Sequence, residues 1–393
     1  MKVTGIEILK LRIPEGTQIR PVICRIHTDA GIYGLGEASV AIVTGAYAAA
    51  EMIKDLSRFI IGADPLQHDL LWERMFKQSF WGKGNGAVVM AAISAIDTAL
   101  WDIKGKYYQA PVYELLGGRH RDKLRAYASQ LQFGWGRQEM ESLGKPEDYA
   151  ESCKRAVEEG YTAVKADVLQ FDEDGRRMPY SELVGSLSRK TMVLAEKRLA
   201  AIRDAAGDDV DIILENHANT DASTAIQLGR LAEAYDVLFY EEPTLPLNPS
   251  VSKKVAEKVS IPLATGERTY TRWGFLPLLE SGVISVIQPD IGNCGGVTEC
   301  RKICDMAHIY DVSVQTHVCS SPLNLAVSLH LEAAIPNFMI HEHHMTSTLK
   351  SVADQFVHDY QPVNGYFEIP DAPGFGQDLS EQAEAEAQIE VIK

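Results

Sequence analysis

Three glutamates recur at an even spacing in the second half of the chain. Glu215, Glu241 and Glu267 each follow a short apolar run and stand 26 residues apart. One strand, one helix and their connections fit this interval, so we expect the three carboxylates at one height on successive strands. Three carboxylates without a sulfur ligand favour a hard cation, and Mg²⁺ is the leading candidate. Glutamates also cap helices and form ion pairs at such junctions, but three in register favour a metal site.

Two histidines accompany these glutamates. His217 lies two residues after Glu215, so on an extended strand both side chains point the same way. Asp290 and His317 end two neighbouring apolar runs. A carboxylate that holds an imidazole fixes its tautomer and raises its basicity, as a general base requires. A lone His317 would more often be structural, but beside a metal site the catalytic interpretation is favoured.

Other polar residues end the remaining runs. Lys165 and Asp167 are two residues apart, so on a strand both side chains point to the same face. This placement is compatible with a local ion pair or with a catalytic role. Glu342 ends the last run, within the sequence HEHH. His343 and His344 follow it, but this order lacks the spacing of a metal-binding helix. We expect these two histidines only to extend the rim of the site.

Apolar runs alternating with helical patterns must position these residues. Eight runs follow one another from about residue 124: LRAYAS, TAVKAD, DIILEN, VLFYEEP, PLATGE, VISVIQPD, VSVQTH and NFMIHE. This alternation favours a (β/α)₈ barrel over an open doubly wound sheet. The sequence contains neither a GxGxxG motif after an early strand nor a Walker motif. Active sites of such barrels lie at the carboxyl ends of the strands, where the polar residues above would converge.

The first part of the chain has a different pattern. Residues 22–39 contain two strand-like runs around Thr28-Asp29-Ala30-Gly31, which predict a hairpin. Residues 44–60 and 86–109 have helical patterns. The stretch from about residue 356 is strand-like and proline-rich, and we expect it to return to the N-terminal part.

Composition excludes several classes of protein. The chain has 393 residues, of which 46% are hydrophobic and 23% charged, as in an ordinary globular protein. Its net charge of −16 argues against a nucleic-acid partner. No apolar run reaches the roughly 18 residues of a membrane span, and the N-terminus alternates like a strand instead of resembling a signal peptide. Six cysteines without a CxxC pair suggest free thiols in a reduced compartment, so we expect a cytoplasmic protein.

Five segments together resemble the mandelate racemase/muconate lactonizing enzyme-like branch of the enolase superfamily, over nearly the whole chain. They are SAIDTALWDIKGK (94–106), FYEEPT (239–244), PLATGER (262–268), QPDIGNCGGVTEC (288–300) and THVCSSP (316–322). The resemblance implies an α/β barrel, a modified TIM barrel closed as (β/α)₇β, with an α+β N-terminal capping domain. The expected parts are a capping domain over 1–123, the catalytic barrel over 124–355, and a C-terminal segment over 356–393 that returns to the capping domain.

The resemblance also implies roles for individual residues. Glu215, Glu241 and Glu267 match the ligands of one Mg²⁺ per subunit, and His317 with Asp290 matches the catalytic dyad. Glu215 departs from the pattern, because the branch usually has aspartate there. A longer ligand can still reach the metal, with a slight shift of the ion or the strand.

Two further matches narrow the expected chemistry. Glu342 matches the acidic group that hydrogen-bonds the developing enolate. Racemases of this branch carry Lys-x-Lys where this chain has Lys165-Ala166-Asp167, so a two-base proton transfer lacks one partner, while Lys165 remains as a catalytic cation. His217 matches the general acid of acid-sugar dehydratases of the D-galactonate/D-gluconate dehydratase type.

These matches predict a lyase that dehydrates a sugar acid with Mg²⁺. Two alternatives remain open: an epimerase, racemase or cycloisomerase of a hydroxy acid or sugar-acid lactone, and a non-catalytic ligand-binding homologue. The expected partner is a small-molecule carboxylate, in a homo-oligomer without membrane or nucleic-acid contacts. We assign substrate contacts to Asp167, Trp81, Arg268 and Arg137, with ordinary loop packing as the alternative for Trp81 and Arg137, and we expect lids at 13–20 and 80–86.

Overall fold

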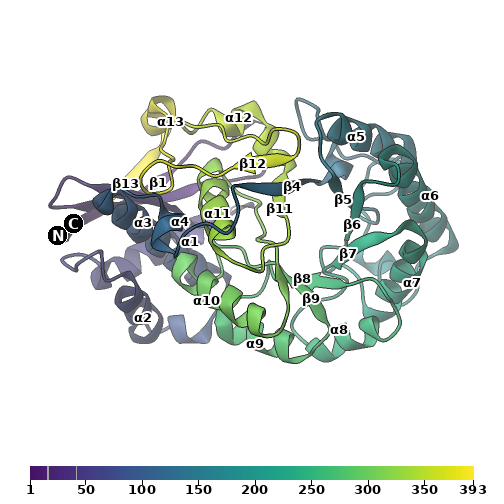
Figure 1. Cartoon of the computed structure of the whole chain (residues 1–393), viewed down its shortest axis with the longest axis horizontal. Helices are drawn as coiled ribbons and strands as arrows, with labels where there is room; N and C mark the ends of the chain where they lie inside the picture. Colours follow the sequence, from purple (N-terminus) through teal and green to yellow (C-terminus); the bar gives the residue numbers. More distant parts are fainter. Residues whose placement is uncertain (16, 41) are drawn as a thin grey trace.

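A four-stranded antiparallel sheet joins the two ends of the chain. In the computed structural model, which describes residues 1–15, 17–40 and 42–393, strands β1 (Val3–Lys10), β2 (Val22–Thr28) and β3 (Tyr33–Glu37) form a meander. The last strand, β13 (Gln388–Ile392), pairs with the free side of β1, and Ile6 lies opposite Ile392. The two termini therefore lie close together (Figure 1). The predicted hairpin over 22–39 is confirmed by the pairing of β2 with β3.

Helices α1 (Gly45–Leu56) and α3 (Ala87–Tyr108) cover this sheet. Helix α2 (His68–Gln78) and the short α4 (Val112–Leu115) pack against α3. Two glycines of β3 allow α3 to approach closely, because a Cβ atom at Gly34 or Gly36 would lie about 2 Å from the carbonyl oxygens of Ala99 and Ala95. The two helices predicted in this region are confirmed, with the first ending in a 3₁₀ turn.

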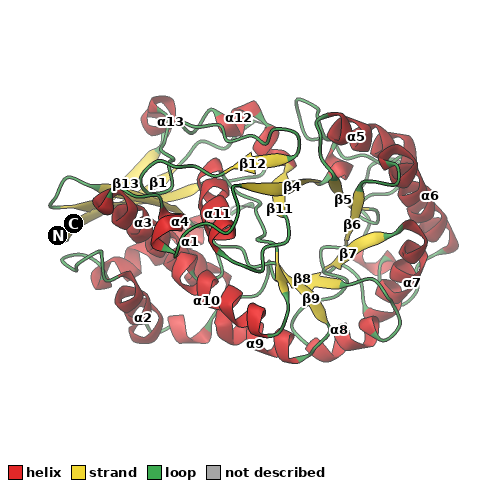
Figure 2. Ribbon diagram, in the orientation of Figure 1, coloured by secondary structure: helices red, strands yellow, loops and turns green. Residues whose placement is uncertain are grey.

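Eight parallel strands form the barrel. In spatial order they are β10 (Ser313–Val314), β9 (Ile284–Ile287), β8 (Leu263–Thr265), β7 (Val237–Glu241), β6 (Asp211–Glu215), β5 (Ala163–Asp167), β4 (Lys123–Ser129) and β11 (His341–His344). An isolated parallel bridge between Val314 and Phe338, just before β11, brings the two ends of this order together. Figure 2 shows the strands surrounded by their helices.

Seven of the strands are each followed by a helix on the outside. These helices are α5 (Pro146–Glu158), α6 (Arg189–Ala206), α7 (Ala222–Ala232), α8 (Pro249–Ala256), α9 (Thr271–Glu280), α10 (Gly296–Ile309) and α11 (Pro322–Ala334). After β11 the chain instead enters a 3₁₀ turn and the short α12 (Lys350–Ala353). The barrel therefore has the expected (β/α)₇β form.

The C-terminal segment contacts both halves of the molecule. Strand β12 (Tyr366–Glu368) pairs antiparallel with barrel strand β4. The chain then passes through α13 (Glu381–Glu386) to β13 at the edge of the N-terminal sheet. The exact domain boundaries at 123 and 355 stay predictions. No helix among the described residues is long and apolar enough to cross a membrane.

Side-chain alternation separates the inside of the barrel from the layer beneath its helices. One apolar cluster, drawn from seven strand regions, fills the interior: Tyr127, Ala163, Ile213, Phe239, Ala264, Val286 and Ile340. The neighbouring residues Ile212 and Leu214 instead belong to the large cluster between strands and helices. Since the pleat has a period of two, Ile213 places Glu215 on the inner face, and Phe239 does the same for Glu241.

The N-terminal helices and sheet sit against the carboxyl ends of strands β9 and β10. Glu37 accepts hydrogen bonds from Ser321 in the loop after β10. Trp72 of α2 donates to the carbonyl oxygen of Gly295 over 2.7 Å. Asp97 of α3 accepts from Thr298 of α10 over 2.6 Å. The N-terminal part thus covers one side of the barrel mouth, and we call it the cap.

Candidate active site

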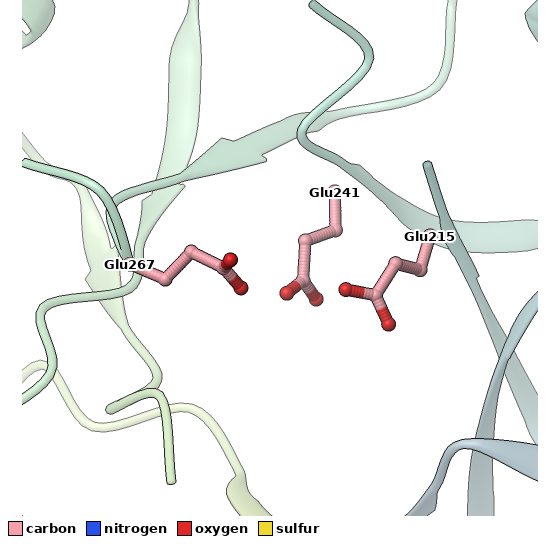
Figure 3. Close-up of side chains that lie close together, drawn as sticks. All are labelled: Glu215, Glu241 and Glu267. Atoms are coloured by element: carbon pink, nitrogen blue, oxygen red, sulfur yellow. The ribbon is translucent and has the colours of Figure 1, made fainter. Parts of the chain in front are cut away.

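Three carboxylates converge at the mouth of the barrel. Glu215 and Glu241 are the last residues of β6 and β7 and lie opposite each other in the parallel register. Glu267 follows β8 by two residues. One oxygen of each carboxylate lies within 4.8 Å of the others, and Figure 3 shows all three directed toward a common space. The spacing of 26 residues therefore corresponds to a common site in space.

Lys165 lies among these carboxylates and is almost completely buried. Its Nζ is 2.9 Å from both oxygens of Glu241, 3.3 Å from Glu215 and 2.9 Å from Glu342. Burial lowers its pKa, but the three carboxylates together raise that pKa well above the usual lysine value. Lys165 is therefore a fixed cation. The local pair with Asp167 considered above is wrong, because all three ion pairs of Lys165 are with glutamates.

His317 and Asp290 form the expected dyad on the β9–β10 side. His317 Nδ1 lies 2.9 Å from Asp290, while Nε2 faces Glu267 at 3.3 Å. Burial lowers the pKa of His317, but Glu267 and Asp290 raise it more, to about 10. The same contacts act on Glu267: burial raises its pKa, while His317 and Arg268 bring it down to about 2.

A second dyad lies on the other side of the glutamates. His217 Nδ1 is 2.8 Å from Asp167, and Nε2 is 3.1 Å from Glu215. Asp167 is 1% exposed, and its other oxygen accepts from the backbone of Leu169. Its assignment to substrate binding is therefore corrected: both its oxygens are engaged, and it holds His217. Burial lowers the pKa of His217, but Glu215 and Asp167 raise it to about 9.

The backbone at His217 is unusual. His217 and Ala218 both adopt left-handed conformations, with φ of 46° and 54°. Such conformations cost free energy in residues with a Cβ and gather at functional sites. The amide of Ala218 donates to the carbonyl oxygen of Glu242 over 3.0 Å, which ties this turn to the next strand.

Glu342 lies beside Lys165 and accepts hydrogen bonds at both oxygens. Ser129 donates to one oxygen over 2.7 Å, and the backbone amide of Val318 donates to the other over 2.9 Å. Burial raises the pKa of Glu342, but Lys165 and His317 hold it well below the usual range. Both oxygens of Glu342 thus accept hydrogen bonds, and Glu342 holds Lys165 in place. The hydrogen bond expected from Glu342 to a developing enolate stays a prediction.

Sequence reasoning missed two polar residues of the site. Gln130, just after β4, donates to Glu215 over 2.7 Å and has a left-handed backbone with φ of 75°. Ser39 of the cap lies 3.4 Å from Asp290, the partner of His317. Neither residue belongs to a motif. The only sequence signal for Gln130 is its place at the end of the first barrel run.

The three remaining predicted residues have different positions. Arg268 lies at the site, where it pairs with Glu242 at 3.0 Å and with Glu267 at 2.6 Å. Arg137 pairs with acidic residues on and before α5, and none of its described ion pairs is with Glu215, Glu241 or Glu267. Trp81 is 69% exposed and stacks edge-on with Phe80. The packing alternative therefore describes Arg137 better than the substrate-contact assignment, whereas the substrate contact of Trp81 stays a prediction.

Of the two loops expected to act as lids, 80–86 is described throughout and 13–20 only in part. Gly16, within 13–20, lies outside the described residues. The 80–86 loop approaches the barrel through Asn85, which donates to the carbonyl oxygen of Tyr270 after β8 over 2.9 Å.

The donor set at the mouth fits a hard divalent cation. All the converging ligand atoms of Glu215, Glu241 and Glu267 are carboxylate oxygens, and neither sulfur nor nitrogen completes the group among the described residues. Oxygen-only sites select Mg²⁺ or a similar ion over softer metals. Burial raises the pKa of Glu241 to about 8 even with Lys165 beside it, so a further positive charge would be well placed here.

Comparison with protein families gives two matches that follow one another along the chain. Residues 10–117 match the mandelate racemase/muconate lactonizing enzyme N-terminal domain. Residues 148–383 match the enolase C-terminal domain-like family, which is more than half of the chain.

Solved structures agree with these matches. A crystal structure described as a "putative dehydratase" from Zymomonas mobilis is 50% identical, covers 100% of this chain and 99% of its own, and has a TM-score of 0.97. A member of the enolase superfamily from Salmonella Typhimurium is 49% identical over 100% of both chains, also with a TM-score of 0.97. The 3,6-anhydro-D-galactonate cycloisomerase from Zobellia galactanivorans is 28% identical over 99% of this chain and 100% of its own, with a TM-score of 0.84.

Proposed function

We propose that this chain, which belongs to the mandelate racemase-like branch of the enolase superfamily, dehydrates a sugar acid with Mg²⁺. The substrate is an aldonate such as gluconate, galactonate or a stereoisomer, and the product is a 2-keto-3-deoxy acid. One observation carries the proposal: two imidazoles, each held at Nδ1 by an aspartate, present Nε2 from opposite sides of the three glutamates.

Glu215, Glu241 and Glu267 would hold the ion. When bound, Mg²⁺ supplies the positive charge that stabilises the enediolate and makes the proton beside a carboxylate removable. Lys165 contributes a second positive charge at the same place, and Glu342 keeps its Nζ in position at 2.9 Å.

His317 acts as the base. Its Nδ1–H donates to Asp290, which leaves the Nε2 lone pair free to take the C2 proton. Breaking the C2–H bond leaves its electron pair in the enediolate, and the proton stays on His317 Nε2.

His217 acts as the acid. Asp167 holds its Nδ1–H, and a proton on Nε2 passes to the 3-hydroxyl, which leaves as water when the C3–O bond breaks. The electron pair of the enediolate forms the C2–C3 double bond. The resulting enol gains a proton at C3 and loses the proton of its 2-hydroxyl group, which gives the ketone. Two similar imidazoles thus have opposite tasks.

A panel of aldonic and aldaric acids, their lactones and anhydro acids tests this proposal. In D₂O with MgCl₂, NMR should show a 2-keto-3-deoxy acid from at least one aldonate, and chelation by EDTA should abolish the reaction. C2 exchange with recovery of an epimer would instead support epimerisation, and an isomer formed without loss of water would support a cycloisomerase, as in the 28% identical relative. Binding without any turnover would support a non-catalytic homologue.

A further inference from the structure

Two of the four residues of β11 face away from the barrel interior. His341 Nδ1 lies 2.6 Å from Glu332 of the outer helix α11. His343 Nδ1 contacts the hydroxyl of Tyr161, and its ring packs edge-on against Trp135. These two histidines belong to the packing between strands and helices.

The other two residues of β11 face inward. Ile340 is part of the apolar cluster inside the barrel, so the period of two places Glu342 and then His344 on the same inner face. The contact of Glu342 with Lys165 is consistent with this parity. The sequence HEHH therefore contains two outward-facing histidines, His341 and His343, which alternate with two inward-facing residues, Glu342 and His344.

The tautomer of His344 is determined by its neighbour Thr346. The backbone amide of Thr346 lies 3.2 Å from His344 Nδ1, and because a backbone amide can only donate, Nδ1 accepts. Burial lowers the pKa of His344 to about 4; the charge of Glu342 acts in the opposite direction, while the positive charges of His317 and Lys165 lower the pKa further. The ring is therefore neutral at pH 7, and its one proton is on Nε2.

This Nε2–H donor has no strong acceptor. Its contact in the described part of the chain is the sulfur of Cys319, at 3.5 Å, and a thiol is a weak acceptor. His344 is only 6% exposed, so bulk water does little to satisfy the donor. A buried donor without a good acceptor costs roughly 1–3 kcal/mol, which a ligand oxygen could recover. Cys319 itself lies two residues after His317 and is half-buried.

The position of His344 indicates which part of a ligand it meets. Two residues along a strand advance about 6.6 Å, so His344 lies that much nearer the mouth than Glu342. Glu342 is at the height of Lys165 and hence of the glutamates. A substrate whose carboxylate is at the glutamates would therefore reach His344 only with atoms beyond its reacting carbons.

We propose that His344 is a specificity-determining residue that donates a hydrogen bond from Nε2 to a hydroxyl of the substrate beyond C3. Its ligand is a polyhydroxylated acid with at least one hydroxyl further along the chain than the reaction requires. The identity of the reaction rests on the proposed function, but the binding contact does not depend on turnover.

Two amide variants separate the donor from the bulk of the ring. The amide nitrogen of glutamine falls near the position of Nε2, whereas that of asparagine falls near Nδ1. His344→Gln should therefore keep the donor, and His344→Asn should lose it. His343→Gln is the matched control on the same strand, because His343 faces outward.

D-Glycerate is the discriminating probe, because it has C2–H and a 3-hydroxyl but no hydroxyl beyond them. With D-gluconate or D-galactonate, whichever is turned over, His344→Asn should lower kcat/KM about 10-fold or more, mainly through KM. His344→Gln and the control should stay within about 3-fold, as should every variant with D-glycerate. An equal loss for aldonate and glycerate, or equal losses in the asparagine and glutamine variants, would overturn the proposal.

A binding measurement keeps this test independent of the proposed reaction. Calorimetry with MgCl₂ and a His317→Asn background measures the Kd of each acid without turnover. Adding His344→Asn should raise the Kd of an aldonate about 10-fold and leave that of D-glycerate unchanged. This result would support the role of His344 even if no aldonate were dehydrated. If no aldonate binds better than D-glycerate to the background variant, the assignment of His344 is wrong.

Discussion

The two histidine–aspartate pairs have nearly the same geometry, but different parts of the molecule contact their aspartates. His317 and His217 each contact an aspartate through Nδ1, at 2.9 and 2.8 Å, and a glutamate through Nε2, at 3.3 and 3.1 Å. Asp290, however, also lies near Ser39 of the cap, at 3.4 Å.

Among the described residues, the hydrogen-bond and ion-pair partners of the His217 pair all belong to the barrel. Asp167 receives the backbone amide of Leu169, and its own amide donates to Gln132 over 3.2 Å. His217 itself stands on a left-handed backbone. The comparison suggests that cap contacts tune the base, whereas a strained barrel turn presents the acid.

The largest expected difference between the two pairs is in the step that each supports. His317→Asn should abolish both C2 exchange and dehydration, by about 10³-fold or more, because it removes the proposed base of the first step. His217→Asn should reduce dehydration by a similar factor while C2 exchange in D₂O persists. NMR of the substrate in D₂O measures both rates in one sample. Retained dehydration in His217→Asn would contradict the division of roles.

Replacing either supporting aspartate should slow the same step as replacing its histidine, but by a smaller factor. Asp290→Asn would favour the wrong tautomer of His317 and should slow C2 exchange by about 10²-fold or more. Asp167→Asn should slow dehydration by a similar factor and leave exchange nearly intact. Circular dichroism and Mg²⁺ affinity serve as controls for folding and for the metal site. Equal effects of both variants on exchange would remove the distinction between the pairs.

The two imidazoles should also respond to the metal in the same direction. In the protein without metal, their pKa values are raised to about 10 and 9, chiefly by Glu267 and Glu215 against the opposing effect of burial. A cation sharing these glutamates offsets their charge, so both pKa values should fall on binding. At pH 8 the imidazoles are protonated beforehand, and Mg²⁺ binding should release about one to two protons.

Calorimetry of MgCl₂ binding in buffers of different ionisation enthalpy measures this release. The apparent affinity should rise with pH between about 7 and 10, by up to tenfold per unit for each proton released. His217→Asn should reduce the number of protons released on Mg²⁺ binding by the part that His217 contributes. A binding enthalpy that is the same in all buffers would contradict the link between the glutamates and the two histidines.

Much of this site could be predicted because strand parity and strand ends are local properties. Glu215, Glu241 and Glu267 end or follow apolar runs, and a parallel barrel brings such ends together whatever the loops do. The same parity placed Lys165 on the inner face, but it did not identify the ion-pair partners of Lys165. Three glutamates on other strands pair with it, and Asp167 on its own strand does not.

Contacts that depend on long-range packing or on backbone turns could not be predicted in this way. Ser39 reaches Asp290 only because the cap docks on the loops after β9 and β10, across 251 residues of sequence. Gln130 reaches Glu215 through a left-handed turn that no sequence pattern marks. Arg137 followed a barrel strand, as a site residue would, yet acidic neighbours close in sequence pair with it instead.

The smallest predicted effect tests whether the cap tunes the base. Ser39→Ala removes a hydroxyl that lies 3.4 Å from Asp290 and 3.3 Å from Asn324. The loss of one long hydrogen bond should lower kcat/KM about 3- to 10-fold. Ser328→Ala is the matched control, because Ser328 is buried in α11 and its hydroxyl has no hydrogen-bond partner among the described residues.

The pH profile decides whether Ser39 acts through the dyad or only through packing. Without this donor the negative charge of Asp290 is less well stabilised, so the pKa of His317 should rise and the acidic limb of the kcat/KM profile should move to higher pH, by less than one unit. The described polar contacts of His217 are all with barrel residues, so Ser39→Ala should act on the base alone and slow dehydration and C2 exchange in parallel. A loss of activity with an unchanged acidic limb would mean that the cap holds the base in place without tuning it, and the two dyads would then differ in position alone.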